Sequence, residues 1–541
     1  MTTKNRRVYL YDTTLRDGAQ TRGIDFTPAD KTAIARALDD LGIDYIEGGW
    51  PGSNPTDDAF FAGPPKLRRA KLVAFGMTRR EGRSASNDET LRPILEAPVA
   101  VACLVGKSSR YQVENILKVP LAENRRMIRD SIRLVAAEKD HAFFDAEHFF
   151  DGYKQDADFS LSCLEAALEG GAEWLVLCDT NGGTLPDEIQ SIVAAVRERL
   201  PDAGLGIHLH NDTETAVAGA LAALVPGVRQ IQGTINGIGE RCGNTNLVSV
   251  IGSLALKTEW KTGVGGDALK RLSETSRLLD ERLNRAPNPA AAYVGDAAFA
   301  HKGGLHASAV AKDTRSYEHI APEQVGNRRQ ILVSSQAGRA NVLARLAEVG
   351  LEIKPDTPRL ASLVKWIKER EAAGYAYEGA DASFLLLARR HLYGEGSPFD
   401  LERFRLISER RRNARGELIT ESEATVMLKV DGAERFTVAI GRHGPVDALN
   451  LALRRALLPD FPVIEDMRLT DYKVRILNSG DATEAVTRVL IDWSDGRRVW
   501  STVGLSHNIL DASLEAILDA VHWRLAAGTD ARRGGKAKSK R

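Results

Sequence analysis

The sequence predicts an α/β fold, a (β/α)8 barrel, followed by a helical linker region and a C-terminal α+β domain with an internal duplication. Short apolar runs rich in β-branched residues alternate with helical stretches over residues 7–237. Polar clusters follow several of these runs, and a strand-turn-strand-helix pattern occurs twice near the C-terminus. With 541 residues, the chain is also far longer than one hydrophobic core requires, so two or more domains are expected.

Eight apolar runs mark the expected strands of the barrel. Segments of helical length separate them, as parallel strands joined by helices require. In the first such helix, Thr27 can cap the N-terminus, Pro28 suits the first turn and Asp30 completes a capping box. The apolar residues of this helix share one face: Ile34, Leu38 and Leu41. The eight runs are RVYLYD, YIEGGW, KLVAFG, VACLVG, AFFDAE, WLVLCD, GIHLHND and QIQGTING.

Polar clusters stand directly after five of these strands. Active sites of (β/α)8 barrels gather at the C-terminal ends of the strands, so these clusters are the candidate site segments. They are DTTLRDGAQ after the first strand, DAEHFFDGYK after the fifth, DTNGG after the sixth, HND after the seventh and NGIGERCGNTN after the eighth.

The sequence pattern changes after the eighth strand. Charged helical stretches predict a linker region, and VMLKVDGAERFTVAIGRHGPVDALNLALRRAL later parallels VLIDWSDGRRVWSTVGLSHNILDASLEAILDAV. Each copy predicts two strands joined by a turn, then a helix beginning near Asp447 or Asp511. The expected domains are the catalytic barrel at 1–270, the helical linker region at 271–415, a duplicated regulatory or dimerisation domain at 416–527 and a disordered basic tail at 528–541.

Composition excludes several classes of protein. The charges of the 73 basic and 73 acidic residues cancel, so the chain has no excess positive charge of the kind that binds nucleic acid. The four cysteines form no CxxC pair, so neither a disulfide framework nor a thiolate zinc site is expected, and a reducing cytoplasm fits best. No signal peptide or run of membrane-spanning length is visible, so a soluble cytoplasmic protein without a membrane partner is expected.

A histidine pair carries the strongest chemical signal. His208 and His210 stand two positions apart in an expected strand, so both rings point to the same face. Asp17 after the first strand and Asn244 after the eighth can reach the same point at the barrel mouth. Two imidazoles with carboxylate and amide oxygens suit Mn²⁺, Zn²⁺ or Mg²⁺ and leave positions for substrate oxygens. Buried histidines satisfied by hydrogen bonds are the alternative interpretation.

The motifs resemble a known family. LRDGAQ with Lys31 downstream, HLHND and GERCGNTN are similar to the group of 2-isopropylmalate, homocitrate and citramalate synthases. The resemblance extends through HKGGLHASAV, SYEHIAPEQVGN and the duplicated C-terminal module, and covers nearly the whole chain. It implies a metal-dependent acyltransferase that condenses acetyl-CoA with a 2-oxo acid, a homodimer, and an active site to which the linker region contributes.

One departure narrows the resemblance. Glu214 stands where 2-isopropylmalate synthases usually have glycine, and together with GGWPGSNPTD and FFDAEHFFDGYK the chain looks more like the longer type of (R)-citramalate synthase. This implies pyruvate as the oxo acid, a place in isoleucine biosynthesis and isoleucine as feedback effector. A sibling synthase for a larger oxo acid, a lyase of the 3-hydroxy-3-methylglutaryl-CoA type and a non-catalytic amino-acid sensor are the alternatives.

The resemblance also implies residue roles. Asp17, His208, His210 and Asn244 match the metal ligands of the family, and Arg16 matches the arginine that stabilises the oxo-acid oxygen.

Other matches have structural alternatives. Thr180 matches a threonine that holds the substrate carboxylate, with a helix cap as alternative, and Glu147 and Glu240 match acidic residues near the reacting centre, with a solvated surface position as alternative. His306 matches the catalytic histidine supplied by the partner subunit, and Tyr317 matches a tyrosine that assists it or only packs.

Overall fold

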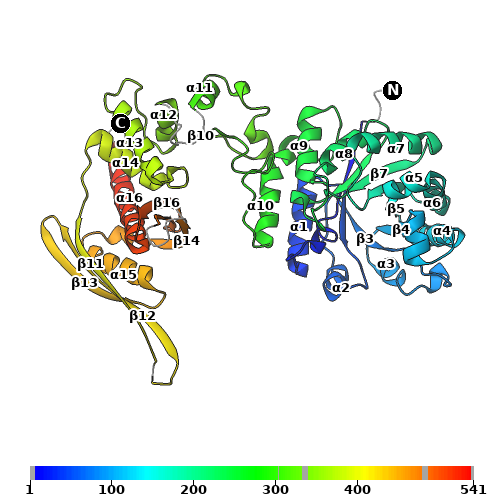
Figure 1. Cartoon of the computed structure of the whole chain (residues 1–541), viewed down its shortest axis with the longest axis horizontal. Helices are drawn as coiled ribbons and strands as arrows, with labels where there is room; N and C mark the ends of the chain where they lie inside the picture. The colour runs from blue at the N-terminus through cyan, green and yellow to red at the C-terminus, as the bar shows by residue number, and fades with distance from the viewer. Residues whose placement is uncertain (1–5, 302–303, 332–338, 413, 478–484, 538–541) are drawn as a thin grey trace. The chain divides into compact units, whose positions relative to one another are not determined.

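The structure is a computed structural model that describes residues 6–301, 304–331, 339–412, 414–477 and 485–537. The chain divides into two compact units, whose elements Figure 1 labels. The first unit comprises Met1–Phe299 with His319–Arg329, and the second comprises Ala300–Glu318 with Gln330–Arg541. Each unit has its own hydrophobic core. None of the described helices has the length and apolar character needed to cross a membrane.

The first unit is a closed barrel of eight parallel strands, each paired with its neighbours in sequence, with β8 returning to β1. All eight expected strands are confirmed. Their order follows the chain, so the C-terminal ends of all strands meet at one rim. The strands are β1 (Tyr9–Asp12), β2 (Tyr45–Gly49), β3 (Lys71–Met77), β4 (Val101–Lys107), β5 (His141–Glu147), β6 (Trp174–Asp179), β7 (Gly204–Leu209) and β8 (Gln230–Gly233).

Helices surround this barrel. In α1, Thr27 and Asp30 form the predicted capping box, and Ile34, Leu38 and Leu41 are buried. The α-helices of the unit are α1 (Pro28–Leu41), α2 (Pro55–Ala62), α3 (Arg92–Glu96), α4 (Leu121–Glu138), α5 (Phe149–Gln155), α6 (Ala157–Gly170), α7 (Pro186–Arg199), α8 (Ala216–Ala223), α9 (Leu247–Lys257) and α10 (Leu272–Arg282).

A layer of large side chains fills the inside of the barrel. Tyr11, Tyr45, Phe75 and Phe143 belong to one buried cluster, and the rings of Tyr45 and Phe143 meet edge to face at 5.1 Å. The interior is therefore a packed core, as expected for an eight-stranded barrel, and it closes the floor beneath the polar groups at the rim.

The second unit begins with helices and ends with two three-stranded antiparallel sheets. The sheets have the orders β11-β12-β13 and β14-β15-β16, and the helix that follows each packs on it, so the predicted duplication is confirmed. Its elements are β9 (Ala300–His301), α11 (Gly304–Lys312), β10 (Gln330–Ile331), α12 (Arg339–Glu348), α13 (Leu360–Ala373), α14 (Asp381–Tyr393), β11 (Asp400–Arg412), β12 (Leu418–Val430), β13 (Ala433–Gly441), α15 (Pro445–Leu457), β14 (Arg468–Ile476), β15 (Thr487–Ser494), β16 (Val499–Ser506) and α16 (Ile509–Ala537).

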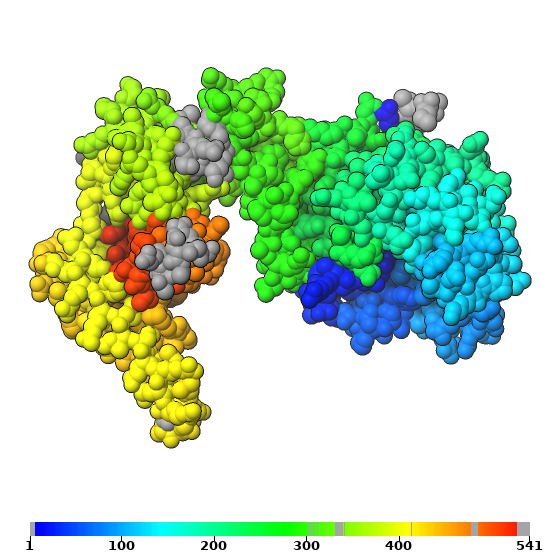
Figure 2. Space-filling model, viewed as in Figure 1, coloured from blue at the N-terminus to red at the C-terminus, as the bar shows by residue number. Residues whose placement is uncertain are grey.

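Each repeat contains one strand more than predicted. β11 lies inside the range expected to be helical linker, and β14 precedes the second copy. Both are edge strands whose side chains are mostly exposed, and hydrogen bonding to β12 and β15 makes them strands. The outer end of the β11–β12 hairpin, where residues 409–412 pair with 418–421, extends beyond β13, as the yellow projection in Figure 2 shows.

The C-terminal helix is longer than the predicted domain. α16 continues to Ala537, past the expected boundary at residue 527, through a stretch that contains the helix-favouring residues alanine and arginine. Residues 538–541, the end of the predicted basic tail, lie outside the described residues.

Candidate active site

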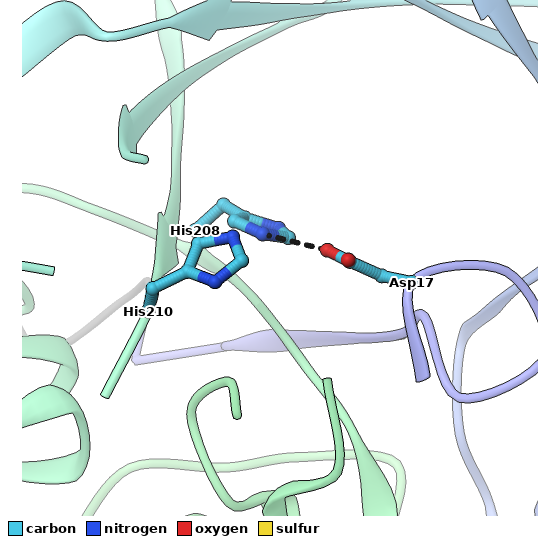
Figure 3. Close-up of side chains that lie close together, drawn as sticks. All are labelled: Asp17, His208 and His210. Atoms are coloured by element: carbon cyan, nitrogen blue, oxygen red, sulfur yellow. Dashed lines mark ion pairs between the residues drawn. The ribbon is translucent and has the colours of Figure 1, made fainter. Parts of the chain in front are cut away.

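Three predicted ligands converge at the C-terminal rim of the barrel (Figure 3). His208 lies on β7, His210 follows that strand, and Asp17 follows β1. All three are buried, and one ligand atom of each lies within 4.8 Å of the others. Asp17 Oδ2 is 3.1 Å from His208 Nε2, and the two imidazole centroids are 5.4 Å apart. The spacing of two residues in a strand therefore aims both rings at one point, as predicted.

Asn244 joins this cluster from the loop after β8. Its Nδ2 donates to Asp17 Oδ2 at 2.9 Å and lies 3.2 Å from His208 Nε2. Among the described residues, His210 Nδ1 and Asn244 Oδ1 are both buried without a hydrogen-bond partner. A buried polar atom without a partner costs about 1–3 kcal/mol, so it calls for an occupant such as an ion. The donor set fits a divalent metal ion, with nitrogen and oxygen ligands on three sides.

Burial and neighbouring charges keep Asp17 and His210 in the forms that ligate metals. Burial and the neighbouring His208 lower the pKa of His210 to about 4, so its ring is neutral at pH 7 and offers a lone pair. Burial works against ionisation of Asp17, but Arg16 and His208 beside it hold the pKa of this carboxyl well below its usual range. A carboxylate and a neutral imidazole are the forms that ligate metals.

Gly239 makes room for Asn244. A Cβ atom at residue 239 would stand 1.9 Å from Asn244 Oδ1, which is too close for any side chain. We therefore expect Gly239→Ala to displace Asn244 and weaken metal binding by about 10-fold or more, the effect typical of disturbing a ligand's support. Metal titration of the purified variant measures this. Gly63→Ala is the control, since a Cβ there meets nothing within 4 Å; equal metal affinity of both variants would contradict the role of Asn244.

Arg16 presents a fixed positive charge beside the cluster. Its Nε donates to Glu47 Oε1 at 2.5 Å, and its guanidinium carbon lies 3.8 Å from the centroid of the Phe75 ring. Tyr11 donates to the other oxygen of Glu47 at 2.6 Å. Burial alone would lower the pKa of Arg16, but Glu47 and Asp17 raise it above its usual range, so the group stays charged. A guanidinium held this way can stabilise negative charge on a substrate oxygen.

One cavity of about 370 Å³ unites the predicted residues of the first unit. It is open at the rim and bounded on one side by Trp50, Phe75 and Met77. Predicted site residues that line it are Arg16, Asp17, Glu147, Thr180, His208, His210 and Glu240.

Glu147 and Thr180 face this cavity from β5 and from the loop after β6. Glu147 Oε2 lies 2.6 Å from Lys107 Nζ. Thr180 Oγ1 accepts the backbone N–H of His148 at 2.8 Å, so its own proton is free to donate. Thr180 is not the N-cap of the following helix α7, which is Leu185. Glu240 is exposed at the cavity.

His306 and Tyr317 belong to the second unit. Their rings stack with centroids 4.1 Å apart and an interplanar angle of 27°. Both side chains are exposed, and His306 lies on α11. The structure therefore brings the two predicted linker residues together as a stacked pair.

Several lining residues were missed from the sequence. Lys107 ends β4, and Asp145 and Cys178 lie inside β5 and β6. The rule that strand ends carry the site could have found Lys107. Asp145 begins the polar cluster DAEHFFDGYK but also belongs to the apolar run AFFDAE, and Cys178 stands within the apolar run WLVLCD.

The position of Glu214 explains the departure noted in its motif. Its backbone φ is 59°, in the left-handed region that favours glycine. Glycine and glutamate therefore fit the same turn here, and the exchange adds a carboxylate without requiring another backbone path.

The whole chain is similar to proteins of known family. Residues 7–278 match the model described as HMGL-like, 293–373 the homocitrate synthase post-HMGL domain-like model, and 378–524 the LeuA allosteric (dimerisation) domain. Enzymes of the HMGL-like family are metal-dependent, in agreement with the buried cluster. The LeuA domain indicates a dimeric protein under allosteric regulation.

Curated relatives cover nearly the full length. The (R)-citramalate synthase of Aquifex aeolicus is 48% identical over 96% of this chain and 98% of its own. That of Geobacter sulfurreducens is 46% identical over 96% and 97%, and that of Synechocystis 45% over 97% and 97%. These similarities favour the citramalate synthase interpretation over the sibling synthases, the lyase and the sensor. With its barrel, its metal-ligand cluster and its duplicated C-terminal domain, the chain belongs to the (R)-citramalate synthase family.

Proposed function

We propose that this chain condenses acetyl-CoA with pyruvate and hydrolyses the resulting thioester, giving (R)-citramalate and CoA for isoleucine biosynthesis. The observation that carries the proposal is the convergence of Asp17, His208 and His210 in a cavity that also contains Arg16 and Thr180. Full-length similarity to proteins named (R)-citramalate synthase supports the choice of reaction.

The proposed metal ligands are Asp17, His208, His210 and Asn244, and Mn²⁺, Mg²⁺ or Zn²⁺ suits this mixed nitrogen and oxygen set. When bound, a divalent ion supplies Lewis-acid stabilisation of negative charge on the oxygens of the oxo acid. His210 Nδ1 and Asn244 Oδ1 support this assignment, because both are buried without a hydrogen-bond partner among the described residues.

Arg16 and Thr180 are proposed to bind pyruvate. The guanidinium of Arg16 stands against Glu47 and Phe75, so it is pre-oriented and stabilises the alkoxide that develops on the keto oxygen as the new C–C bond forms at the keto carbon. The Thr180 hydroxyl accepts the His148 N–H and donates its free proton to the substrate carboxylate. Neither group has to reorganise during the reaction.

His306 is proposed as the base that removes the methyl proton of acetyl-CoA. An imidazole ring nitrogen can accept a proton and pass it on, which suits a general base. Tyr317 holds the ring by stacking, and Glu147 or Glu240 at the cavity provides an acceptor that orients the imidazole or the hydrolytic water. The histidine is supplied to the cavity of one subunit by the partner subunit of a homodimer.

The reaction is tested by thiol release from acetyl-CoA with pyruvate, 2-oxobutyrate, 2-oxoisovalerate and 2-oxoglutarate, with and without Mn²⁺. We expect the highest kcat/KM with pyruvate, and a rate that falls to background after metal removal. Preference for a larger oxo acid would keep the mechanism and overturn the substrate. No thiol release with any oxo acid would overturn the proposed function.

Isoleucine is proposed as the feedback effector of the duplicated C-terminal domain. The match to the LeuA allosteric domain supports regulation by an amino acid, and isoleucine is the end product of a citramalate route. We expect isoleucine to lower the initial rate, and leucine at the same concentration to lower it less. Deletion of the sheet β14-β15-β16 should abolish this inhibition by isoleucine. Full activity at saturating isoleucine would contradict the assignment.

A further inference from the structure

We infer that Gln232 is a positioning residue for His208, and that Asp145 fixes the direction of the Gln232 side-chain amide. The inference rests on the metal site of the proposed function and adds two residues that are not among the proposed metal ligands. It concerns a buried chain of hydrogen bonds that runs from the barrel interior to the histidine pair.

The contacts form a continuous line across three strands. His208 on β7 and Gln232 on β8 are paired neighbours in the barrel, and His208 Nδ1 lies 2.9 Å from Gln232 Oε1. Gln232 Nε2 donates to Asp145 Oδ1 on β5 at 3.0 Å. The exposed fractions of His208, Gln232 and Asp145 are 5%, 0% and 3%, so water does not compete for these bonds.

Asp145 decides which way the amide points. Its Oδ1 receives two donors, the Gln232 Nε2 and the Cys103 thiol at 3.2 Å, so this oxygen is an acceptor. A flipped Gln232 amide would place its own oxygen against Asp145 Oδ1, acceptor against acceptor, which is unfavourable. The observed orientation therefore leaves Gln232 Oε1 facing His208.

The amide in turn selects the tautomer of His208. Since Gln232 Oε1 can only accept, His208 Nδ1 carries the proton. Nε2 is then left with its lone pair directed at the cluster, where Asp17 Oδ2 lies 3.1 Å away. Metal-ligating histidines usually donate their other ring N–H to such a partner, and that partner sets the affinity of the site. In this chain, Gln232 Oε1 is the partner of the His208 ring N–H.

The same chain of hydrogen bonds also accounts for a second buried cluster of possible metal-ligating side chains. Glu47, Cys103 and Asp145 offer atoms close enough together to hold an ion. The oxygens of Glu47 already accept from Tyr11 and Arg16, and Asp145 accepts from Cys103 and Gln232. The structure therefore assigns Glu47 to the support of Arg16, and Asp145, through Gln232, to the support of His208.

Mn²⁺ binding to the full-length chain, measured by calorimetry without substrates, tests the inference. Gln232→Leu removes the acceptor for His208 Nδ1–H and is expected to weaken Mn²⁺ binding about 10- to 100-fold. Asp145→Asn is nearly isosteric, but its amide can donate to Gln232 Oε1. It therefore permits the flipped orientation of the Gln232 amide and should also weaken Mn²⁺ binding. The double variant Gln232→Glu with Asp145→Asn restores both an acceptor for His208 Nδ1–H and a donor toward residue 232, so it should bind Mn²⁺ more tightly than Gln232→Leu.

Cys103→Ala is the matched control. It removes the other donor to the same Asp145 oxygen but leaves the Gln232–His208 contact intact, so its Mn²⁺ affinity should stay within about threefold of wild type. Thermal unfolding of each variant shows that the barrel is folded. Wild-type affinity in Gln232→Leu and in Asp145→Asn would overturn the inference while leaving the proposed function. A wild-type chain that binds no divalent ion would overturn the proposed function and this inference together.

Discussion

Replacement of His208 by alanine is expected to abolish metal-dependent turnover. His208 Nε2 lies at the centre of the cluster, 3.1 Å from Asp17 Oδ2 and 3.2 Å from Asn244 Nδ2. Substitution of a residue that supports a metal ligand typically lowers metal affinity about 10- to 100-fold. Loss of the ligand itself should lower metal affinity by more than about 100-fold. The measurements are bound metal per chain after dialysis and thiol release from acetyl-CoA with pyruvate.

His141→Ala is the control for this variant. His141 begins β5, at the opposite end of the barrel from the site, and pairs with Glu173 on the surface. It should retain metal and activity. Normal metal content in His208→Ala would remove His208 from the ligand set, and loss of metal in His141→Ala would show that the effect is not local.

Replacement of His306 by alanine is expected to lower kcat about 100- to 10,000-fold, the contribution typical of general acid–base catalysis. Metal content should be unchanged, because His306 belongs to the second unit and not to the ligand cluster. Tyr317→Phe keeps the stacked ring and should retain turnover within about tenfold of wild type, since stacking needs no hydroxyl. Near-normal kcat in His306→Ala would reject this residue as the base.

Hybrid dimers distinguish a base supplied by the partner subunit from one supplied within the subunit. When His208→Ala and His306→Ala chains assemble at random, half of the dimers are hybrids, each with one complete site if His306 acts across the dimer. About a quarter of wild-type activity should then return in a C2 dimer. No recovery in verified hybrid dimers would show that His306 serves its own subunit.

The strands of the barrel could be predicted because burial imposes a pattern. Parallel strands that are covered on both faces consist mainly of apolar and β-branched residues, and the sequence contains such a run for each of the eight barrel strands. β11 and β14 could not be predicted in this way, since they are edge strands with mostly exposed side chains, and only their partners β12 and β15 make them strands. Edge pairing depends on contacts between segments, which periodicity within one segment does not contain.

The candidate site shows the same division. Asp17, His208 and Asn244 could be predicted because Asp17 and Asn244 follow barrel strands and His208 lies next to the C-terminal end of β7, so all three reach one rim. Gln232 and Asp145 could not, because they stand inside strands, and their role depends on a neighbour across the barrel. Local patterns predict which residues reach the rim, whereas hydrogen-bond direction within the core requires the structure.

The central claim is that the cluster of Asp17, His208 and His210 binds a divalent ion that also receives pyruvate. The most direct measurement is anomalous X-ray diffraction from crystals grown with Mn²⁺ and pyruvate. The account predicts one strong anomalous peak within coordination distance of Asp17, His208 and His210, with the carboxylate and keto oxygens of pyruvate beside it. An anomalous peak elsewhere in the chain, with pyruvate bound away from these three residues, would contradict it.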